Sequence, residues 1–264
     1  MMADDIRHNI RVYVAAQKTH LKEAISYRAQ FLIYIGYFLI LSASNLIGVT
    51  IIYGNSNGIL GWSYYQMLIL TATAALLFNL VLFTMDPGWF VNSMARGDMD
   101  IALSRPINSV VSLLSETGSK EILSAALGSL LVIGYALPHI SSTPLQLFGF
   151  AVMFLFGLTA IISVWLFMVV LSYHLFKKGG FMYTLQGIFA ISGQYPKALF
   201  GFGGGLLLTF VFPVALATTY PAETLFGAIG VYEYAAILLL CVAMAVLGYL
   251  GTKELLRHYC SGGG

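Results

Sequence analysis

The stretch Met94-Ala95-Arg96-Gly97-Asp98-Met99-Asp100-Ile101-Ala102-Leu103-Ser104-Arg105-Pro106 contains the densest mixture of charges in a chain that is otherwise mostly apolar. On its amino-terminal side, residues 29–85 include no Asp, Glu, Lys or Arg. That block is too long for one transmembrane helix of about 20 residues and has the right length for two. We therefore expect the charged stretch to lie in water, directly after a pair of membrane-spanning helices.

The overall composition indicates an integral membrane protein. Apolar residues make up 59% of the 264 residues and charged residues only 9%, whereas about a quarter of the residues in a soluble domain are charged. The predicted fold is all-α, a polytopic membrane protein with one transmembrane domain over residues 1–264. The net charge of +2 is too small to indicate a nucleic-acid partner. Cys241 and Cys260 lack the spacing of metal ligands, and no disulfide is expected because the tail is predicted to be cytosolic.

Residues 4–28 are predicted to form an amphipathic helix that lies on the membrane surface. Apolar residues from Ile6 to Ile25 recur at helical spacing. The basic residues on the other face are Arg7, Arg11, Lys18 and Lys22. This arrangement suits the anionic cytosolic leaflet of a membrane. The alternative is an ordinary solvated helix that packs on its own protein.

The pattern of apolar blocks predicts six transmembrane helices. They lie at about residues 31–53, 64–85, 121–138, 145–176, 198–217 and 233–251. Residues 86–120 form a cytosolic segment, residues 181–196 an interfacial helix on the cytosolic side, and residues 218–232 an outer, re-entrant connection. Within the fifth helix, Gly203, Gly204 and Gly205 loosen the start, and Pro213 deprives the Thr209 carbonyl of its helical partner, so we expect bending there.

The basic residues support this topology. All thirteen Lys and Arg residues fall before the first span, between the second and third, between the fourth and fifth, or after the sixth. Basic residues in the loops of membrane proteins concentrate on the cytosolic side. Both termini are therefore predicted to be cytosolic.

The sequence lacks the motifs of several kinds of chemistry. It contains no G-x-x-x-x-G-K-[ST], no H-E-x-x-H and no G-x-S-x-G. No acidic residue lies near the middle of a predicted span, although an ion-driven carrier usually needs such a carboxylate. An active transporter with this sequence would need a separate subunit to supply its energy.

A series of short motifs, in order and in topological position, matches one known family. They are Ser26-Tyr27-Arg28, Gly61-Trp62-Ser63, Arg96-Gly97-Asp98-Met99-Asp100, Ser104-Arg105-Pro106, Tyr195-Pro196, Phe212-Pro213, Tyr220-Pro221-Ala222 and His258-Tyr259-Cys260-Ser261-Gly262-Gly263. With these motifs the chain resembles the ABC-2 type permease superfamily, and within it the small bacterial branch of uncharacterised ABC-2 permease components. The resemblance covers nearly the whole chain.

The resemblance implies a function and a set of partners. Such permeases pair as two six-span subunits in the bacterial inner membrane and bind two ATPase subunits, which hold ATP and Mg²⁺, so this chain needs no cofactor of its own. It implies a permease rather than an enzyme, an exporter with a substrate path lined by spans one, two and five. The many Phe, Tyr, Leu and Met residues of the chain suit a hydrophobic or amphiphilic substrate. The implied ATPase-coupling residues, within about 92–106, are Arg96, Gly97, Asp98, Asp100, Arg105 and Pro106. The implied outer gate contains Tyr220 and Pro221, with hinges at Gly203–Gly205 and Pro213.

The residues of the charged stretch agree with this interpretation and leave alternatives open. An Arg fork suits a carboxylate on a partner, while Asp98 and Asp100 suit basic residues there. Arg96 and Asp100, four residues apart, are also spaced to pair on a short helix. The alternative for the stretch is a solvated turn with no partner. The alternatives for the whole chain are a non-transporting membrane anchor or regulator of an ATPase, and an ion-coupled carrier or channel.

Overall fold

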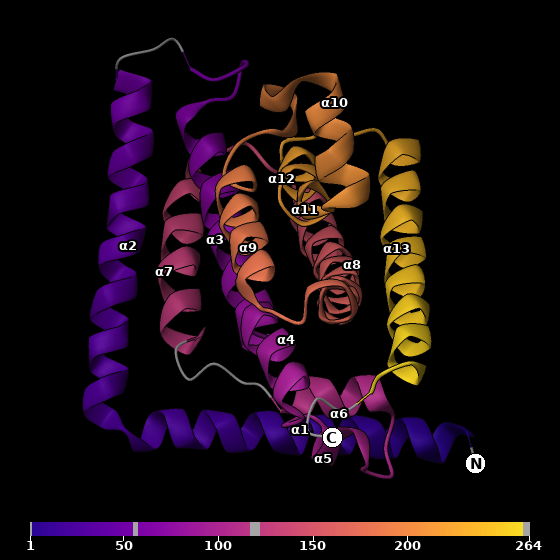
Figure 1. Cartoon of the computed structure of the whole chain (residues 1–264). Helices are drawn as coiled ribbons and strands as arrows, with labels where there is room; N and C mark the ends of the chain where they lie inside the picture. Colours follow the sequence, from indigo (N-terminus) through magenta and orange to yellow (C-terminus); the bar gives the residue numbers. More distant parts are fainter. Residues whose placement is uncertain (1, 55–57, 117–121, 261–264) are drawn as a thin grey trace.

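The computed structural model describes residues 2–54, 58–116 and 122–260, which contain helices and no strand (Figure 1). The first half comprises α1 Met2–Ser26, α2 Arg28–Gly54, α3 Tyr64–Thr84, α4 Pro87–Arg96, α5 Asp100–Leu103, α6 Ser109–Ser115, α7 Ile122–Ala136 and η1 Leu137–His139. The second half comprises α8 Pro144–Phe176, α9 Gly180–Ser192, η2 Lys197–Phe200, α10 Gly201–Leu206, η3 Leu207–Val211, α11 Val214–Ala217, α12 Thr219–Leu225 and α13 Val231–Arg257. The first residue of the predicted third span, the end of segment 86–120 and the last motif residues lie outside the described part.

Helix α1 lies across one end of the helical bundle, and α2 rises from its carboxyl end (Figure 1). The prediction of a helix over residues 4–28 is confirmed with bounds Met2–Ser26. The basic side chains Arg7, Arg11, Lys18 and Lys22 are exposed, and so are the apolar Ile10 and Val14. An exposed apolar side chain beside exposed basic ones fits a helix at a membrane surface, which remains a prediction.

Four helical stretches in the described part are long and apolar enough to cross a membrane: Arg28–Gly54, Tyr64–Arg96, Pro144–Phe176 and Val231–Arg257. Ala126–His139 forms a shorter apolar helix. The second stretch combines α3 and α4: α3 ends at Thr84, next to the predicted end of the second span at residue 85, and α4 begins at Pro87. The Asp86 side chain accepts a hydrogen bond from the Trp89 backbone N–H at 3.1 Å and restarts the helix as an amino-terminal cap.

Capping residues fix the starts of α3 and α8. The Thr143 hydroxyl accepts from the Gln146 backbone N–H at 3.3 Å, and the Gln146 side chain accepts from the Thr143 backbone N–H at 2.7 Å. Ser63 and Gln66 form the same capping box before α3. The predicted start of the fourth span is thereby confirmed, with Pro144 at the first helical position.

Helices α8 and α13 run side by side in the same direction. Near their starts, the Tyr234 hydroxyl donates to the Gly149 carbonyl at 3.1 Å. Near their ends, the His174 ring donates to the His258 carbonyl at 3.4 Å. Because the two helices are parallel, the chain between them must return from one end of the bundle to the other.

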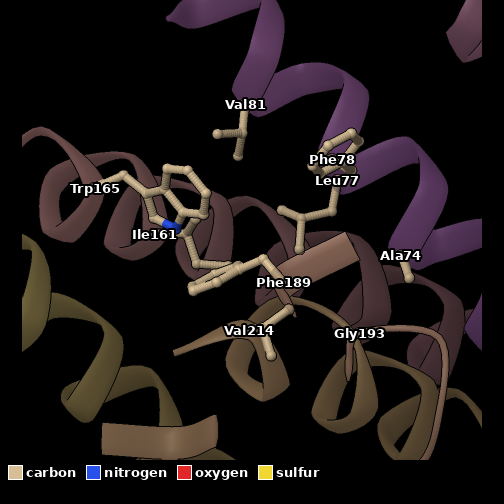
Figure 2. A pocket seen from close by; sticks show the side chains of 9 residues that line it. All are labelled: Ala74, Leu77, Phe78, Val81, Ile161, Trp165, Phe189, Gly193 and Val214. Atoms are coloured by element: carbon tan, nitrogen blue, oxygen red, sulfur yellow. The ribbon is translucent and has the colours of Figure 1, made fainter. Parts of the chain in front are cut away.

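That return is made by α9, which lies in the bundle. The Gly179 backbone N–H donates to the Asn92 side chain at 2.9 Å, at the end of the bundle where α4 lies. The Phe189 ring packs edge-on against Trp165 of α8, with centroids 4.5 Å apart. Figure 2 shows Phe189 directed toward Ile161 and Trp165 in a cavity of about 20 Å³ that α3, α8, α9 and α11 enclose. The prediction of an interfacial helix over residues 181–196 is therefore wrong.

The predicted fifth span, residues 198–217, is not a single helix. Lys197–Val211 and Val214–Leu225 are two arms bent by 76° at Phe212-Pro213, so the predicted bend at Pro213 is present but far sharper than a kink. The Lys197 ammonium lies 3.3 Å from the Glu223 carboxylate. A segment whose two ends touch returns to where it started, and we call residues 197–225 the re-entrant hairpin.

This contact also corrects the predicted outer connection. Lys197 was predicted to lie inside the cell and Glu223 outside, yet the two side chains form an ion pair. Lys197 and Glu223 therefore lie at the same end of the hairpin, so the two residues cannot lie on the opposite sides that were predicted for them. The hairpin fits because Gly157 of α8 has no side chain where the Leu216 carbonyl of α11 approaches it. Its carboxyl arm is buried from Val214 to Thr219.

Candidate functional site

The charged stretch lies at the end of the bundle where α1 crosses, and residues 92–106 are called the polar segment below (Figure 1). Helix α4 ends at Arg96 because Gly97 adopts a left-handed conformation, with φ +81°, which favours glycine. The Gly97 and Asp98 N–H groups donate to the carbonyls of Met94 and Ser93 at 3.2 and 2.9 Å. This is the Schellman pattern of a helix end, and it turns the chain sharply after Arg96.

Arg96 pairs with Asp98. Its Nε donates to Asp98 Oδ2 at 2.8 Å, and one terminal nitrogen lies 2.7 Å from the same oxygen. The predicted pair with Asp100 is wrong, because the turn at Gly97 ends the helix that would have aligned the two side chains. The Arg96 and Asp98 side chains are 57% and 52% exposed, so the pair adds only about 0–1 kcal/mol to stability. Both charges remain accessible to a partner.

Asp100 is held by the carboxyl-terminal residues. The Tyr259 hydroxyl lies 2.8 Å from Asp100 Oδ1 and 3.0 Å from the Met94 carbonyl, and it donates to one of them at a time. Burial, and then the hydrogen bond to the Asp100 carboxylate, raise the pKa of Tyr259, so the hydroxyl keeps its proton as a donor. The Tyr173 hydroxyl of α8 donates to the Cys260 carbonyl. Residues 258–260 therefore connect the polar segment to α8 and α13.

The second half of the polar segment is anchored by an ion pair and by buried side chains. An Arg105 guanidinium nitrogen lies 2.6 Å from the Glu116 carboxylate, which connects the loop after α5 to the end of α6. Met99 and Ala102 are buried in the main core. The Ser112 hydroxyl donates to the Ala102 carbonyl. The segment is thus a fixed projection and not a free loop.

Asn108, just after the polar segment, joins three helices. Its side chain accepts from the Val110 backbone N–H at 3.0 Å as the cap of α6, and donates to the Tyr249 hydroxyl of α13 at 2.9 Å. Its backbone N–H donates to the Asn9 side chain of α1 at 3.1 Å. Asn before an apolar run is a known cap signal, but no sequence pattern indicates the contacts with α1 and α13.

Helix α1 is fixed to the same structure through the backbone of α6. The Gln17 side chain donates to the Leu114 carbonyl at 3.3 Å, and the His20 ring donates to the Ser115 carbonyl at 3.3 Å. A movement of the polar segment would therefore reach α1 as well as α8 and α13.

The tip of the polar segment is exposed and mixed in character. Ile101 at the tip is 73% exposed. Its exposed neighbours in the segment are Arg96, Asp98, Ser104, Arg105 and Pro106. An exposed apolar side chain and exposed charges of both signs, in a segment that is anchored to the bundle, form a surface that fits a protein partner.

The predicted hinge and gate residues lie in the re-entrant hairpin, at the opposite end of the bundle (Figure 1). Gly203, Gly204 and Gly205 lie within α10, and Pro213 lies between the arms. The structure brings Tyr220 under the Lys197 ammonium, 3.3 Å from the ring centroid, and buries Pro221. These residues share one element, but their role in bending or gating remains a prediction.

A comparison with known protein families matches residues 21–263 to the ABC-2 family transporter proteins. The chain belongs to the ABC-2 family of transporters. The resemblance carried by its short motifs is thereby confirmed, and so is its character as a membrane-embedded transporter permease. Proteins of this family are membrane subunits that work with ATP-binding subunits. A search of curated proteins and a search of solved structures found no significant match.

Proposed function

We propose that this ABC-2 family protein is the permease subunit of an exporter for a hydrophobic or amphiphilic substrate, driven by a separate ATPase. The observation that carries the proposal is the exposed, anchored polar segment in a chain of this family. The sequence has no phosphate-binding loop of the Walker type. ATP and Mg²⁺ would therefore bind to the partner and not to this chain.

The polar segment would receive the force from the ATPase. Arg96, Asp98 and Arg105 would make ion pairs with the partner, Gly97 and Pro106 would shape the loop, and Ile101 would bury its side chain. The helical stretch Tyr64–Arg96 leads from the segment through the bundle. Asp100 and Asn108 lead to α13. Movement of the segment would in this way be passed to the helices and finally to the re-entrant hairpin, with Gly203–Gly205 and Pro213 as hinges and Tyr220 and Pro221 at the gate.

The proposed assembly has two permease subunits, identical or paralogous, and two ATP-binding subunits. Support for a second permease comes from α2, where Val49 is the one buried residue among the side chains that the structure describes. Because the rest of the chain covers so little of the surface of α2, lipid or a neighbouring subunit can pack against this helix. The substrate path would lie at that interface.

We further propose six crossings of the bacterial inner membrane with both termini in the cytosol. The crossings are α2, α3 with α4, α7, α8, α9 and α13, and the re-entrant hairpin dips in from the outer side. The parallel course of α8 and α13 supports this order, because it requires α9 as a return crossing. The basic face of α1, with Arg7, Arg11, Lys18 and Lys22, would lie against the anionic inner leaflet.

Co-purification with the cognate ATPase tests the role of the polar segment. Ile101→Asp, Arg96→Glu and Arg105→Glu are each expected to reduce the amount of ATPase that co-purifies at least tenfold, because they place charge on the proposed contact. Tyr232→Ser is the control, since Tyr232 is 94% exposed and outside this surface. Wild-type recovery of the ATPase with all three variants, in correctly inserted protein, would rule out this surface as the docking site.

A further inference from the structure

A groove of about 440 Å³ lies between the re-entrant hairpin and α13. Its walls are apolar and include Phe202, Leu206 and Phe210 of the hairpin and Leu240 of α13. Lys197 and Tyr220 line its polar part. At roughly 30 Å³ per water molecule, the groove has room for far more than a small ion.

Lys197 contacts one carboxylate and one aromatic ring and is partly exposed. Its Nζ lies 3.3 Å from Glu223 Oε2 and 3.3 Å from the centroid of the Tyr220 ring. A charge-assisted hydrogen bond between ammonium and carboxylate is normally about 2.7–2.9 Å long, so this pair is loose. An ammonium has three donors, and within the described residues Glu223 accepts one of them. The side chain is 24% exposed and can meet an anion in the groove.

The position of Lys197 sets it apart from the other lysines near it in the chain. Phe226, beside α12, packs on Trp62 of the α2–α3 connection, with centroids 5.4 Å apart, so the hairpin lies at that end of the bundle. The turn that contains Lys177 and Lys178 is bound to Asn92 at the other end. A cation in an apolar region away from the basic face of a membrane protein usually has a functional partner.

The groove is open toward the surroundings of the bundle. The Phe202 side chain is 86% exposed, and Phe210 is 52% exposed. In a membrane protein, exposed aromatic side chains along a groove face acyl chains. A small hydrophilic anion would gain nothing from these walls, whereas an amphiphile would bury its chain against them.

We propose that this groove binds one anionic lipid of the surrounding bilayer. The phosphate would lie at the Lys197 ammonium and compete with Glu223 for it, and an acyl chain would lie along Phe202, Phe210 and Leu240. The proposal rests on the membrane character of the protein and not on the docking of an ATPase. Failure of the co-purification test would leave it untouched.

Because the phosphate and Glu223 would compete for the Lys197 ammonium, the proposal predicts opposite changes in retained lipid when either Glu223 or Lys197 is replaced. Glu223→Gln removes the carboxylate that occupies the ammonium, so the variant is expected to retain more anionic lipid than the wild type. Lys197→Gln removes the cation and is expected to retain about tenfold less, a change that corresponds to about 1.4 kcal/mol. A purely structural ion pair predicts loss of stability in both variants and no change in bound lipid in either.

The experiment is native mass spectrometry of protein purified from vesicles of equal parts phosphatidylglycerol and phosphatidylcholine. The measured quantity is the ratio of retained phosphatidylglycerol to phosphatidylcholine. Leu240→Trp narrows the groove where the acyl chain would lie and leaves the charges in place, so it is expected to lower the ratio as Lys197→Gln does. Lys178→Gln is the matched control, because Lys178 is an exposed lysine outside the groove.

Two outcomes would overturn the proposal. One is a ratio that stays at the wild-type value in both Leu240→Trp and Glu223→Gln. The other is an equal fall in Lys178→Gln, which would show general attraction of lipid to surface lysines. If Lys197→Gln fails to fold, as judged by gel filtration, these two variants still decide the matter because they keep the cation.

Discussion

Tyr259 contacts the polar segment at two points, the Asp100 carboxylate and the Met94 carbonyl. Its ring also packs on Tyr173 of α8, with centroids 5.1 Å apart. Hydrogen bonds to charged groups contribute about 1.5–3 kcal/mol when buried, and partial exposure lowers this toward 1 kcal/mol. The hydroxyl therefore accounts for a measurable share of the rigidity of the segment.

Tyr259→Phe is predicted to loosen the polar segment without unfolding the bundle. The ring and its packing remain, while the donor to Asp100 is lost. Amide hydrogen exchange in residues 98–105 is expected to speed up about fivefold, which corresponds to about 1 kcal/mol. Tyr232→Phe is the control, because Tyr232 is 94% exposed. Equal exchange in the two variants would show that the Tyr259 hydroxyl does not hold the segment.

The ion pair between Arg105 and Glu116 gives a second prediction at this scale. Glu116→Gln removes the partner charge and is expected to raise exchange in residues 103–107, and to leave residues 93–98 unchanged because the turn at Gly97 is closed by its own backbone. Because the Arg105 and Glu116 side chains are 41% and 29% exposed, the exchange rate is expected to rise by about twofold to fivefold and no more. Hydrogen exchange of the two peptides in one sample measures it, and faster exchange in residues 93–98 would contradict it.

At the residue scale, sequence patterns identify the exposed tip but not its internal contacts. Arg96 and Asp98 are exposed because the stretch is too polar for the core. The partner of Arg96 depends on a left-handed glycine, and the spacing of the charges does not reveal it. Asn108 and Tyr259 act through residues about a hundred positions or more away, a distance at which single-sequence patterns carry no information.

At the element scale, small residues decide how closely the helices approach. Gly248 of α13 faces the Ser163 and Val164 backbone of α8, and a Cβ added there would lie within 3.0 Å of that backbone. The Thr252 hydroxyl donates a hydrogen bond to the Gly248 carbonyl at 2.7 Å, so this hydroxyl finds its partner within its own helix. The parallel pair of helices thus depends on a glycine contact typical of membrane helices.

Gly248→Leu is predicted to separate α8 from α13 and to destabilise the protein by about 1–3 kcal/mol, the range of overpacked cores. The unfolding temperature in detergent measures the effect. Gly36→Leu in α2 is the control, since no atom lies within 4 Å of the Cβ position there. An equal change in unfolding temperature for the two variants would contradict the close contact.

The polar residues of α9 explain why the sequence pattern predicted an interfacial helix over residues 181–196. Tyr183, Thr184, Gln186 and Ser192 make the stretch look too polar for the bundle. The Thr184 and Ser192 hydroxyls donate to the carbonyls of Gly180 and Phe189 at 3.2 and 3.3 Å, so their polarity is satisfied within the helix. Long apolar runs such as Pro144–Phe176 were predicted well because they carry no such ambiguity.

At the scale of the whole molecule, the positive-inside rule and the fold disagree on one residue. Every basic residue was predicted to lie inside the cell, but Lys197 pairs with Glu223 within the re-entrant hairpin, whose α10 lies at the end of the bundle opposite α1 (Figure 1). The positive-inside rule compares the numbers of basic residues in whole loops, so one lysine on the outer side does not contradict it. The fold favours the proposed order, because the parallel α8 and α13 require the chain to return to the other end of the bundle between them.

Cysteine labelling decides between the two topologies. In a background with Cys241→Ser and Cys260→Ser, Leu199→Cys is expected to react with a membrane-impermeant maleimide added to whole cells, because Leu199 is 48% exposed in η2, beside Lys197 and outside the groove lining, on the side proposed to be outer. Lys178→Cys, at the turn between α8 and α9, is expected to react only after the cells are permeabilised. Under the order predicted from charge alone, residue 199 would begin an outward crossing from the cytosolic side and stay unlabelled in whole cells. Labelling of Leu199→Cys only after permeabilisation would therefore remove α9 as a crossing and return the hairpin to the inner side.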